Sequence, residues 1–204
     1  MSNKLCRKGY LLVISSPSGG GKTTIYNALL AKGEPFNFSV SLTTRPPRPT
    51  EIDGVHYRFV SDEEFTHLVD KNEFAEWAFV HGHRYGTLRD SIEKAFIDGV
   101  IMILEIDVQG ALQIKENYPQ DSVLVFIAPP SIEETERRLR ARETNTPEDI
   151  VLRIKNAIDE IANAHQFDYL VINDDLQMAI SDVSCIARAE YLKKCRFLGE
   201  IWED

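Results

Sequence analysis

The residues with the clearest chemistry form a glycine-rich loop, Ser16-Pro17-Ser18-Gly19-Gly20-Gly21-Lys22-Thr23. Glycines allow successive backbone N–H groups to turn toward phosphate oxygens. Lys22 supplies positive charge for the β- and γ-phosphates of a nucleotide, and the Thr23 hydroxyl is a ligand for Mg²⁺. The spacing is that of a P-loop except at Ser16, where the pattern has glycine. The sequence therefore predicts a site for a nucleotide phosphate chain.

The surroundings of this loop separate two interpretations. A glycine-rich turn with a surface lysine is the alternative to a phosphate site. The loop lies between an apolar segment at residues 10–15 and a segment with helical spacing at 23–32, which is the strand–loop–helix context of a P-loop. The loop alone identifies no reaction, because ATPases, GTPases and small-molecule kinases share it.

Two acids lie at the end of the near-continuous apolar run at residues 100–106. Glu105 is its second-last residue, and Asp107 comes directly after it. Such a run is typical of a strand buried on both faces. Ligands of open α/β sheets gather at the carboxyl ends of strands. Because alternate side chains share a face, both acids can line one cleft, where they would hold Mg²⁺-bound water or a hydrogen-bond donor. A solvated strand end is the alternative.

Arginines gather in two segments. Arg138 and Arg142 are four residues apart in one predicted helix, and Arg153 follows in the next. They can close over phosphates as a mobile lid, or form a solvated face paired with the glutamates between them. Arg45 and Arg48 lie in a proline-rich segment whose forked donors suit a second phosphate site. An ordinary surface loop is the alternative there.

Short apolar segments alternate with helical ones, which predicts an α/β protein built on a sheet. We expect strands at residues 10–15, 36–40, 56–60, 73–80, 100–106, 123–128 and 169–172. We expect helices at 23–32, 61–71, 88–98, 131–142 and 147–164, and a last one from about residue 175. Loop signals and short elements at 41–80 predict a small α+β insert on the main domain.

Composition limits the classes of partner. The 204 residues suggest one domain, and 23 Lys and Arg against 32 Asp and Glu give a net charge of -9. This disfavours a nucleic-acid polymer or an anionic membrane as partner, but not a small anion. The three cysteines show no Cys-x-x-Cys spacing, which favours a reducing cytoplasm. No apolar run approaches the ~20 residues of a membrane span.

Taken together, the motifs resemble those of the guanylate kinases, a P-loop family of nucleoside-monophosphate kinases. The similarity covers roughly residues 9–189. Besides the glycine loop it rests on Ser39-Val40-Ser41-Leu42-Thr43-Thr44-Arg45-x-Pro47-Arg48, Gly54-x-x-Tyr57-x-Phe59-Val60, Glu73-Phe74-x-Glu76, Tyr85-Gly86-Thr87, Leu104-x-Ile106-Asp107-x-Gln109-Gly110, Ile127-Ala128-Pro129-Pro130-Ser131 and Val171-Ile172-Asn173-Asp174-Asp175.

The resemblance implies ATP-dependent phosphorylation of GMP, and of dGMP, to the diphosphate, with ADP as the other product and Mg²⁺ accompanying ATP. The role would be in purine nucleotide metabolism. It also implies a P-loop NTPase-like parallel sheet flanked by helices. On a core of residues 9–40, 81–136 and 156–189 it places a GMP-binding insert at 41–80 and a helical lid at 137–155, followed by a tail at 190–204.

The resemblance also assigns roles to single residues. Those for ATP are Ser16, Pro17, Ser18, Gly19, Gly20, Gly21, Lys22, Thr23 and Thr24, with Asn173 near adenine. Those for the GMP phosphate are Arg45, Arg48, Tyr57 and Tyr85, and those for guanine are Ser41, Glu76 and Thr87, with Asp107 nearby. The catalytic set is Lys22, Arg138, Arg142 and Arg153, and Mg²⁺ would be held by Thr23 and through water by Asp107.

Two features depart from the family pattern, Ser16 in the loop and Glu105 where aspartate is common. Two other functions remain open: a non-catalytic guanylate-kinase-like domain that binds peptides, and a kinase for a different acceptor. The intact Lys22 and Thr23 argue against the first, and Glu76 with Ser41 argues against the second. The tail is expected to form a helix packed on the domain or on another subunit, which allows a homo-oligomer.

Overall fold

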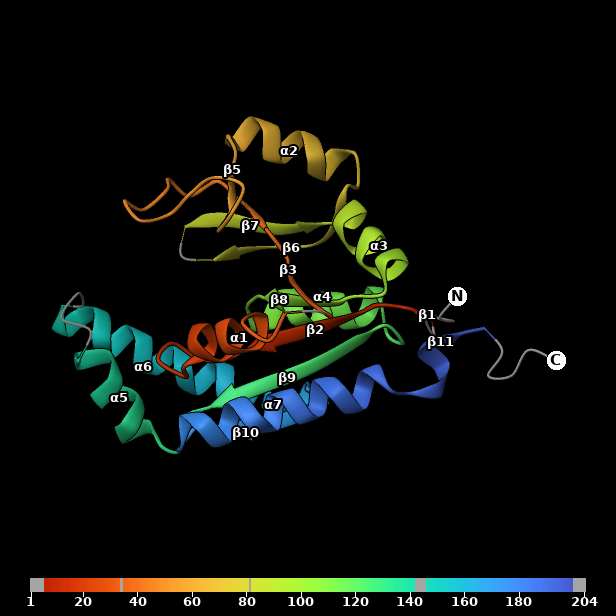
Figure 1. Ribbon diagram of the computed structural model, residues 1–204. Helices are drawn as coiled ribbons and strands as arrows, with labels where there is room; N and C mark the ends of the chain where they lie inside the picture. Colours follow the sequence, from red (N-terminus) through yellow and green to blue (C-terminus); the bar gives the residue numbers. More distant parts are fainter. Residues whose placement is uncertain (1–5, 34, 81, 142–145, 200–204) are drawn as a thin grey trace.

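A five-stranded parallel sheet lies at the centre of the computed structural model, which describes residues 6–33, 35–80, 82–141 and 146–199 (Figure 1). Its order is β10-β9-β2-β8-β3, and every neighbouring pair is parallel. The strands are β2 (Tyr10–Ser15), β3 (Phe36–Phe38), β8 (Ile101–Glu105), β9 (Ser122–Ala128) and β10 (Tyr169–Ile172). The predicted α/β fold, with a P-loop between strand and helix, is confirmed.

The central strands are buried on both faces, which explains why they are continuous apolar runs. In β2, Leu12 and Ile14 contribute to one hydrophobic cluster, while Leu11 and Val13 contribute to the cluster on the opposite face. This alternation follows from the two-residue period of a strand. The sheet therefore needs helices on both sides.

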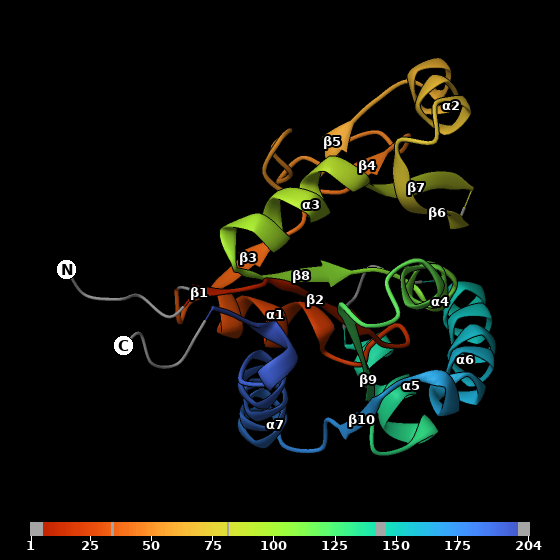
Figure 2. The ribbon, with the colours of Figure 1, turned by 90° about the vertical axis from the view of Figure 1, so that its right-hand side faces the viewer.

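Helices cover both faces of this sheet. They are α1 (Lys22–Leu30), α3 (Arg89–Asp98), α4 (Val108–Asn117), α5 (Ile132–Arg140), α6 (Pro147–Ala162) and α7 (Leu176–Tyr191), with short turns η1 (Ala164–Gln166) and η2 (Lys194–Arg196). Helices α1 and α7 supply one cluster, and α3 and α4 supply the other (Figure 2). Within the ranges that the structure describes, no helix has the length and apolar character to cross a membrane.

A second, four-stranded sheet lies on the α3 side of the core (Figures 1 and 2). Its order is β5-β4-β7-β6, made of β4 (Leu42–Thr43), β5 (Arg58–Phe59), β6 (Phe74–Val80) and β7 (His83–Leu88), with α2 (Asp62–Asp70) beside it. Strand β7 pairs with both β4 and β6. The expected insert boundary at residue 80 thus falls within a hairpin, and this sheet extends to Leu88.

Helix α4 connects the two sheets. Gln113 donates from its amide to the Trp77 carbonyl at 2.9 Å and accepts from the Trp77 N–H at 3.2 Å. Asn117 donates to the carbonyl of Ala75 at 2.9 Å. These bonds fix the segment of β6 between Ala75 and Trp77 against the core. Neither α4 nor β7 was among the expected elements.

The end of the chain differs from expectation. Helix α7 ends at Tyr191, and β11 (Phe197–Leu198) pairs antiparallel with β1 (Cys6–Arg7). The prediction of a helix in the tail is therefore wrong for residues 192–199, the described part of the tail after α7. Between α7 and β11, the guanidinium carbon of Arg196 lies 4.2 Å from the ring centroid of the buried Tyr10. This cation–π contact and the short ladder attach the tail to the start of β2.

Gly33 and Gly99 both occupy turns with a positive φ, but they differ in the space around them. Their φ values are +76° and +69°, and a Cβ at residue 33 would meet nothing within 4 Å, whereas one at residue 99 would lie 2.5 Å from the Arg7 carbonyl oxygen. We expect G33A to cost about 1 kcal/mol from backbone strain alone. G99A should cost about 1–3 kcal/mol more because it also forces overpacking. Urea unfolding of both variants measures the difference, and equal costs would contradict this account.

Candidate functional site

Three neighbouring cavities lie where β2 and β8 end and the second sheet faces the core. Their volumes are about 180, 590 and 270 Å³. Glu105 lines all three; Lys22 and Asp107 line the first and third, and Tyr57 and Tyr85 line the first and second. The cavities therefore adjoin, and the predicted donor and acceptor residues face one connected region.

The glycine loop forms the wall of the 270 Å³ cavity. Its lining contains all nine predicted loop residues: Ser16, Pro17, Ser18, Gly19, Gly20, Gly21, Lys22, Thr23 and Thr24. Gly19 and Gly21 have φ of +89° and +90°, a conformation that favours glycine. The Gly20 N–H donates to the Pro17 carbonyl at 3.0 Å, so it serves the loop itself. The start of α1 at Lys22 adds partial positive charge to this cavity.

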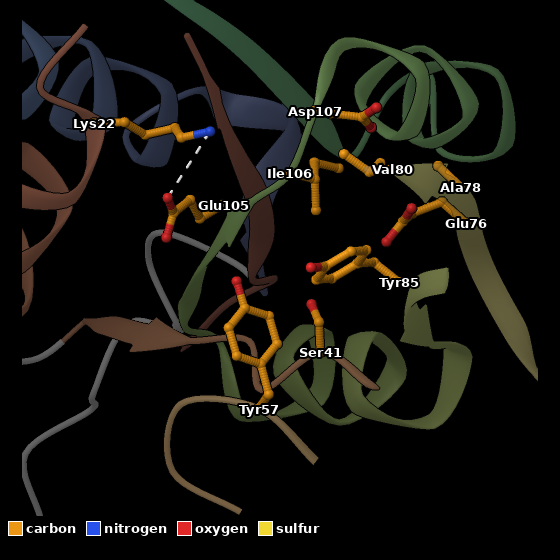
Figure 3. A pocket seen from close by; sticks show the side chains of 10 residues that line it. All are labelled: Lys22, Ser41, Tyr57, Glu76, Ala78, Val80, Tyr85, Glu105, Ile106 and Asp107. Carbon is orange, nitrogen blue, oxygen red and sulfur yellow. Dashed lines mark ion pairs between the residues drawn. The ribbon is translucent and has the colours of Figure 1, made fainter. Parts of the chain in front are cut away.

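Lys22 points across the cavity toward the end of β8. Its Nζ lies 3.8 Å from Oε1 of Glu105 (Figure 3). Burial raises the pKa of Glu105, while the charge of Lys22 and a hydrogen bond with Tyr26 oppose the shift. Tyr26 follows Lys22 by one helical turn on α1. The three side chains thus form a polar group between the glycine loop and the 590 Å³ cavity, which Tyr26 also lines.

A buried carboxylate dominates the 180 Å³ cavity. Glu76 of β6 is only 4% exposed, and its Oε1 accepts from the Thr87 hydroxyl at 2.7 Å. A Cβ at residue 110 would lie 2.7 Å from Oε2, so a side chain there would displace the Glu76 carboxylate from its present position. Burial raises the pKa of Glu76 to about 7; the Thr87 hydroxyl opposes this shift and the charge of Asp107 adds to it. Figure 3 shows Glu76 and Tyr85 directed into the cavity.

The other predicted base-reading residues take different places. The Ser41 hydroxyl lies 3.3 Å from that of Thr87, and Ser41 lines the cavity. Thr87 is fully buried and lies behind Glu76 instead of on the cavity surface. Asp107 lines the cavity, and its Oδ1 accepts from the Gly110 N–H at 2.9 Å as the N-cap of α4. The structure thus brings all of these residues together. Thr87 differs from the others because it contacts Glu76 and not the cavity.

Arg45 reaches the 590 Å³ cavity with its donors already engaged. Its Nε donates to the Tyr85 hydroxyl at 3.2 Å, and its Nη2 donates to both oxygens of Glu51 at 2.8 and 2.9 Å. Glu51 also accepts from the Arg48 backbone N–H at 2.8 Å. Burial acts to raise the pKa of Glu51, but these bonds outweigh it and the pKa is lowered. The ring of Tyr57 packs edge-on against that of Tyr85, with 5.9 Å between the ring centroids.

Arg48 differs from Arg45 in its exposure. Its side chain is 72% exposed and lies 4.0 Å from Glu51. A surface ion pair of this kind contributes little, so this side chain is available to a ligand. The proline-rich segment therefore supplies one anchored and one largely exposed guanidinium to the same cavity.

The lid-side arginines divide into two groups. Arg138 donates to the Asn173 carbonyl at 2.9 Å, and Arg153 donates to the Ser18 hydroxyl at 3.1 Å, so both contact the loop region. Arg138 also pairs with Glu134 of α5 but is only 23% exposed, whereas Arg137 and Arg140, which pair with glutamates too, are 71% and 61% exposed. The solvated-face interpretation holds for these two. The predicted catalytic Arg142 lies outside the described residues.

Glu51, Tyr26 and Glu160 are among the residues of the site that were not assigned from the sequence. Tyr26 was detectable, because it lies four residues after Lys22 on a helix and shares its face. Glu160 lines the loop cavity, and burial raises its pKa, with Lys22 opposing the shift. Its position depends on how α6 packs, which no local pattern shows. Glu51 depends in the same way on a turn that returns it to Arg45.

Comparisons with known proteins agree with this geometry. The family model described as guanylate kinase matches residues 8–190. The chain is 48% identical to "Guanylate kinase" of Chelativorans sp. (strain BNC1) over 193 residues, 95% of this chain and 88% of that protein. It is 44% identical to "Guanylate kinase" of Caldanaerobacter subterraneus subsp. tengcongensis over 190 residues, 93% and 90% of the two chains.

A solved structure shows the same fold. The crystal structure of guanylate kinase from Anaplasma phagocytophilum matches with a TM-score of 0.79 and 38% identity, covering 96% of this chain and 93% of that one. The family match spans both sheets, the glycine loop and the cavities between them. On this evidence of sequence and structure, the chain belongs to the guanylate kinase family of enzymes.

Proposed function

We propose that this protein transfers the γ-phosphoryl group of ATP to GMP, giving ADP and GDP. The observation that carries the proposal is the buried Glu76 carboxylate in a cavity that adjoins the glycine loop. Because the contacts that we assign go to base and phosphate, dGMP is proposed as a second acceptor. Formation of a guanosine diphosphate places the enzyme in purine nucleotide metabolism.

Glu76 supports the choice of guanine over adenine. An ionised carboxylate accepts from the N1–H and the N2 amino group of guanine, and adenine offers no such pair of donors. Thr87 holds one oxygen of Glu76 at 2.7 Å and thereby sets the orientation of the carboxylate. Ser41 lies at the cavity surface beside it. We assign Ser41 and Glu76 to the base and Thr87 to the positioning of Glu76.

The 590 Å³ cavity supports binding of the acceptor phosphate. Arg45, Arg48, Tyr57 and Tyr85 all line it. Two guanidinium groups and two phenolic hydroxyls suit the oxygens of a monophosphate dianion. Glu51 keeps Arg45 extended toward Tyr85, so the phosphate would meet an arginine already in place.

The donor phosphates belong in the glycine loop, with Lys22 on the β- and γ-phosphates. Arg153 reaches the loop from α6 and Arg138 from α5, and both suit charge that spreads over phosphoryl oxygens in the transition state. Arg142 is proposed for the same role from the resemblance. The reaction requires no protein base, since phosphoryl transfer depends mainly on positioning and charge stabilisation.

Mg²⁺ fits the oxygen donors of the loop cavity. Thr23 and Asp107 both line it, and magnesium prefers hard oxygen ligands while keeping several waters. Within the part of the chain that the structure describes, no group of three His, Cys, Asp or Glu could hold a metal by itself. This suits an ion held mainly by nucleotide oxygens, with Thr23 as ligand and Asp107 through water. When bound, the ion would neutralise charge on the β- and γ-phosphates.

The three parts of the chain take separate roles in this proposal. The core with the glycine loop binds ATP, the second sheet binds GMP, and the lid at 137–155 closes over the phosphates and excludes water. A peptide-binding module has no use for the lysine, threonine and glycine geometry of the loop, all of which are in place. An acceptor whose base lacks the donors of guanine would bring no further hydrogen bond to the buried Glu76, whose Oε1 accepts from Thr87.

Glu76→Gln tests the reading of guanine. The amide cannot accept from both guanine donors, so kcat/KM for GMP should fall about 100-fold, as for loss of a hydrogen bond to a charged group. The ratio of GMP to AMP turnover should fall with it. A coupled ADP-release assay across GMP, dGMP and AMP measures both. Glu63→Gln, an exposed change on α2, is the matched control. Unchanged GMP turnover in E76Q would refute the role.

The pKa of Glu76 predicts a pH dependence of GMP binding. Burial favours the protonated form, with a pKa of about 7, but guanine needs the carboxylate. Binding should therefore weaken as pH falls below 7, with Kd about tenfold higher at pH 6 than at pH 8. Calorimetry without Mg²⁺ measures this. The GMP phosphate also titrates near pH 6, so the decisive quantity is the dependence that disappears in E76Q. Parallel profiles for the two proteins would contradict the prediction.

Lys22→Met tests the donor site. Loss of a positive charge aimed at the transferring group should lower kcat by about 10²–10³-fold. Fluorescence or calorimetric titration should show GMP binding little changed, because Lys22 serves the phosphates of ATP. Lys94→Met on the exposed face of α3 is the control. A kcat within a few-fold of wild type in K22M would show that Lys22 does not carry the assigned charge.

A further inference from the structure

Asn173 occupies an unusual place for a polar residue at the end of a strand. It directly follows β10, and its backbone N–H continues the ladder by donating to the Ala128 carbonyl at 2.8 Å. The residue is only 4% exposed. Its side chain is therefore held at the carboxyl edge of the sheet, beside the glycine loop.

The side-chain amide of Asn173 contacts the loop directly. Its Nδ2 donates to the Gly20 carbonyl at 2.8 Å. A Cβ at residue 21 would lie 2.2 Å from the same nitrogen. The amide thus packs so closely on the Gly20–Gly21 peptide that a side chain at position 21 would displace it, and the φ of +90° there favours glycine as well.

This contact determines the direction of a phosphate donor. In a trans peptide the C=O and the following N–H point in opposite directions. With the Gly20 carbonyl turned to Asn173, the Gly21 N–H is turned away from Asn173. Gly20 and Gly21 line the 270 Å³ cavity and Asn173 is not among its lining residues, so we infer that the N–H side of this peptide faces the cavity. A backbone N–H so directed is the group that a phosphate oxygen needs.

Asn173 also contacts the lid side. Its own carbonyl accepts from Nη2 of Arg138 at 2.9 Å, and Arg138 is held in turn by Glu134 at 2.7 Å. The next residue of α5, Leu139, lies 3.8 Å from where a Cβ of Gly19 would be. A chain of contacts therefore runs from α5 through Asn173 to the Gly20–Gly21 peptide.

We propose that Asn173 is a positioning residue that orients the Gly20–Gly21 peptide for the donor phosphates and links the position of Arg138 to the loop. The role is distinct from contact with the adenine base, which the family resemblance suggests for this segment. It rests on the proposed function only in taking the ligand of the loop to be the phosphate chain of ATP.

The test uses Asn173→Asp and Asn173→Ala in the full chain. Asp has the size of Asn but presents an acceptor to the Gly20 carbonyl, while Ala removes the bond. The probes are ATP and inorganic tripolyphosphate, which has no base. We expect both variants to bind tripolyphosphate and ATP at least about tenfold more weakly, N173D more so than N173A, with GMP affinity unchanged. The unchanged GMP affinity also verifies that each variant is folded.

Asn163→Ala is the matched control, because Asn163 likewise donates from its side-chain amide to a backbone carbonyl, that of Asp159, at 2.8 Å. It should leave tripolyphosphate binding as in wild type. If the Asn173 variants lose ATP affinity but keep tripolyphosphate affinity, the residue reads the base and the positioning role is wrong. Wild-type binding of both ligands would also overturn it. Failure of the wild-type enzyme to phosphorylate GMP would instead refute the proposed function, and the tripolyphosphate measurement would still stand.

Discussion

The parallel pairing of β2 with β8 is the constraint on which the whole site depends. Val13 lies opposite Leu104 and Ile14 opposite Glu105, so the glycine loop and the acids leave the sheet at the same edge. A slip of one residue would turn every side chain of a strand to the other face, and burial on both faces prevents it. In this register the Lys22 ammonium comes within 3.8 Å of Glu105. The same strand leads into α4, which fixes β6 and thereby the Glu76 carboxylate that lines the 180 Å³ cavity.

The buried charges of the site are costly to the fold. Glu76 is 4% exposed and burial raises its pKa to about 7, and burial raises the pKa of Glu105 as well. A buried carboxylate is unfavourable unless donors surround it, and such perturbed groups gather at functional sites. The charge of Arg45 is instead compensated within the protein, since its guanidinium donates to both carboxylate oxygens of Glu51. The net charge of -9 therefore describes the protein as a whole, whereas the proposed binding of phosphates depends on a few local cations and a helix N-terminus.

Features that depend on a continuous run or a local bond were predictable from the sequence. The segments at 100–106 and 123–128 predicted strands, and the helices expected at 131–142 and 147–164 correspond to α5 and α6, whose N-caps are Ser131 and Thr146. Strand β7 was not predictable in this way, because His83-Arg84-Tyr85-Gly86 has no apolar alternation, and it becomes a strand through pairing on both sides. Helix α4 was detectable, because its buried Val108, Ala111 and Ile114 follow helical spacing, but its bonds to β6 through Gln113 and Asn117 were not. Of the site, the motif residues were predictable, whereas Glu51 and Glu160 depend on contacts made only after folding.

Ser16 shows how one departure from the motif is accommodated within the loop. Its side chain is 8% exposed, and its hydroxyl donates to the Pro17 carbonyl at 3.1 Å. A Cβ at residue 20 would lie 2.8 Å from this hydroxyl, so Ser16 fills the space that Gly20 leaves open. Gly20 in turn donates to Pro17 at 3.0 Å and accepts from Asn173 at 2.8 Å. Since these bonds lie within the protein, the shape of the loop is set without a phosphate. A preorganised loop loses less conformational entropy when a ligand binds, and the larger residue at position 16 is therefore compatible with phosphate binding because glycine stands at position 20.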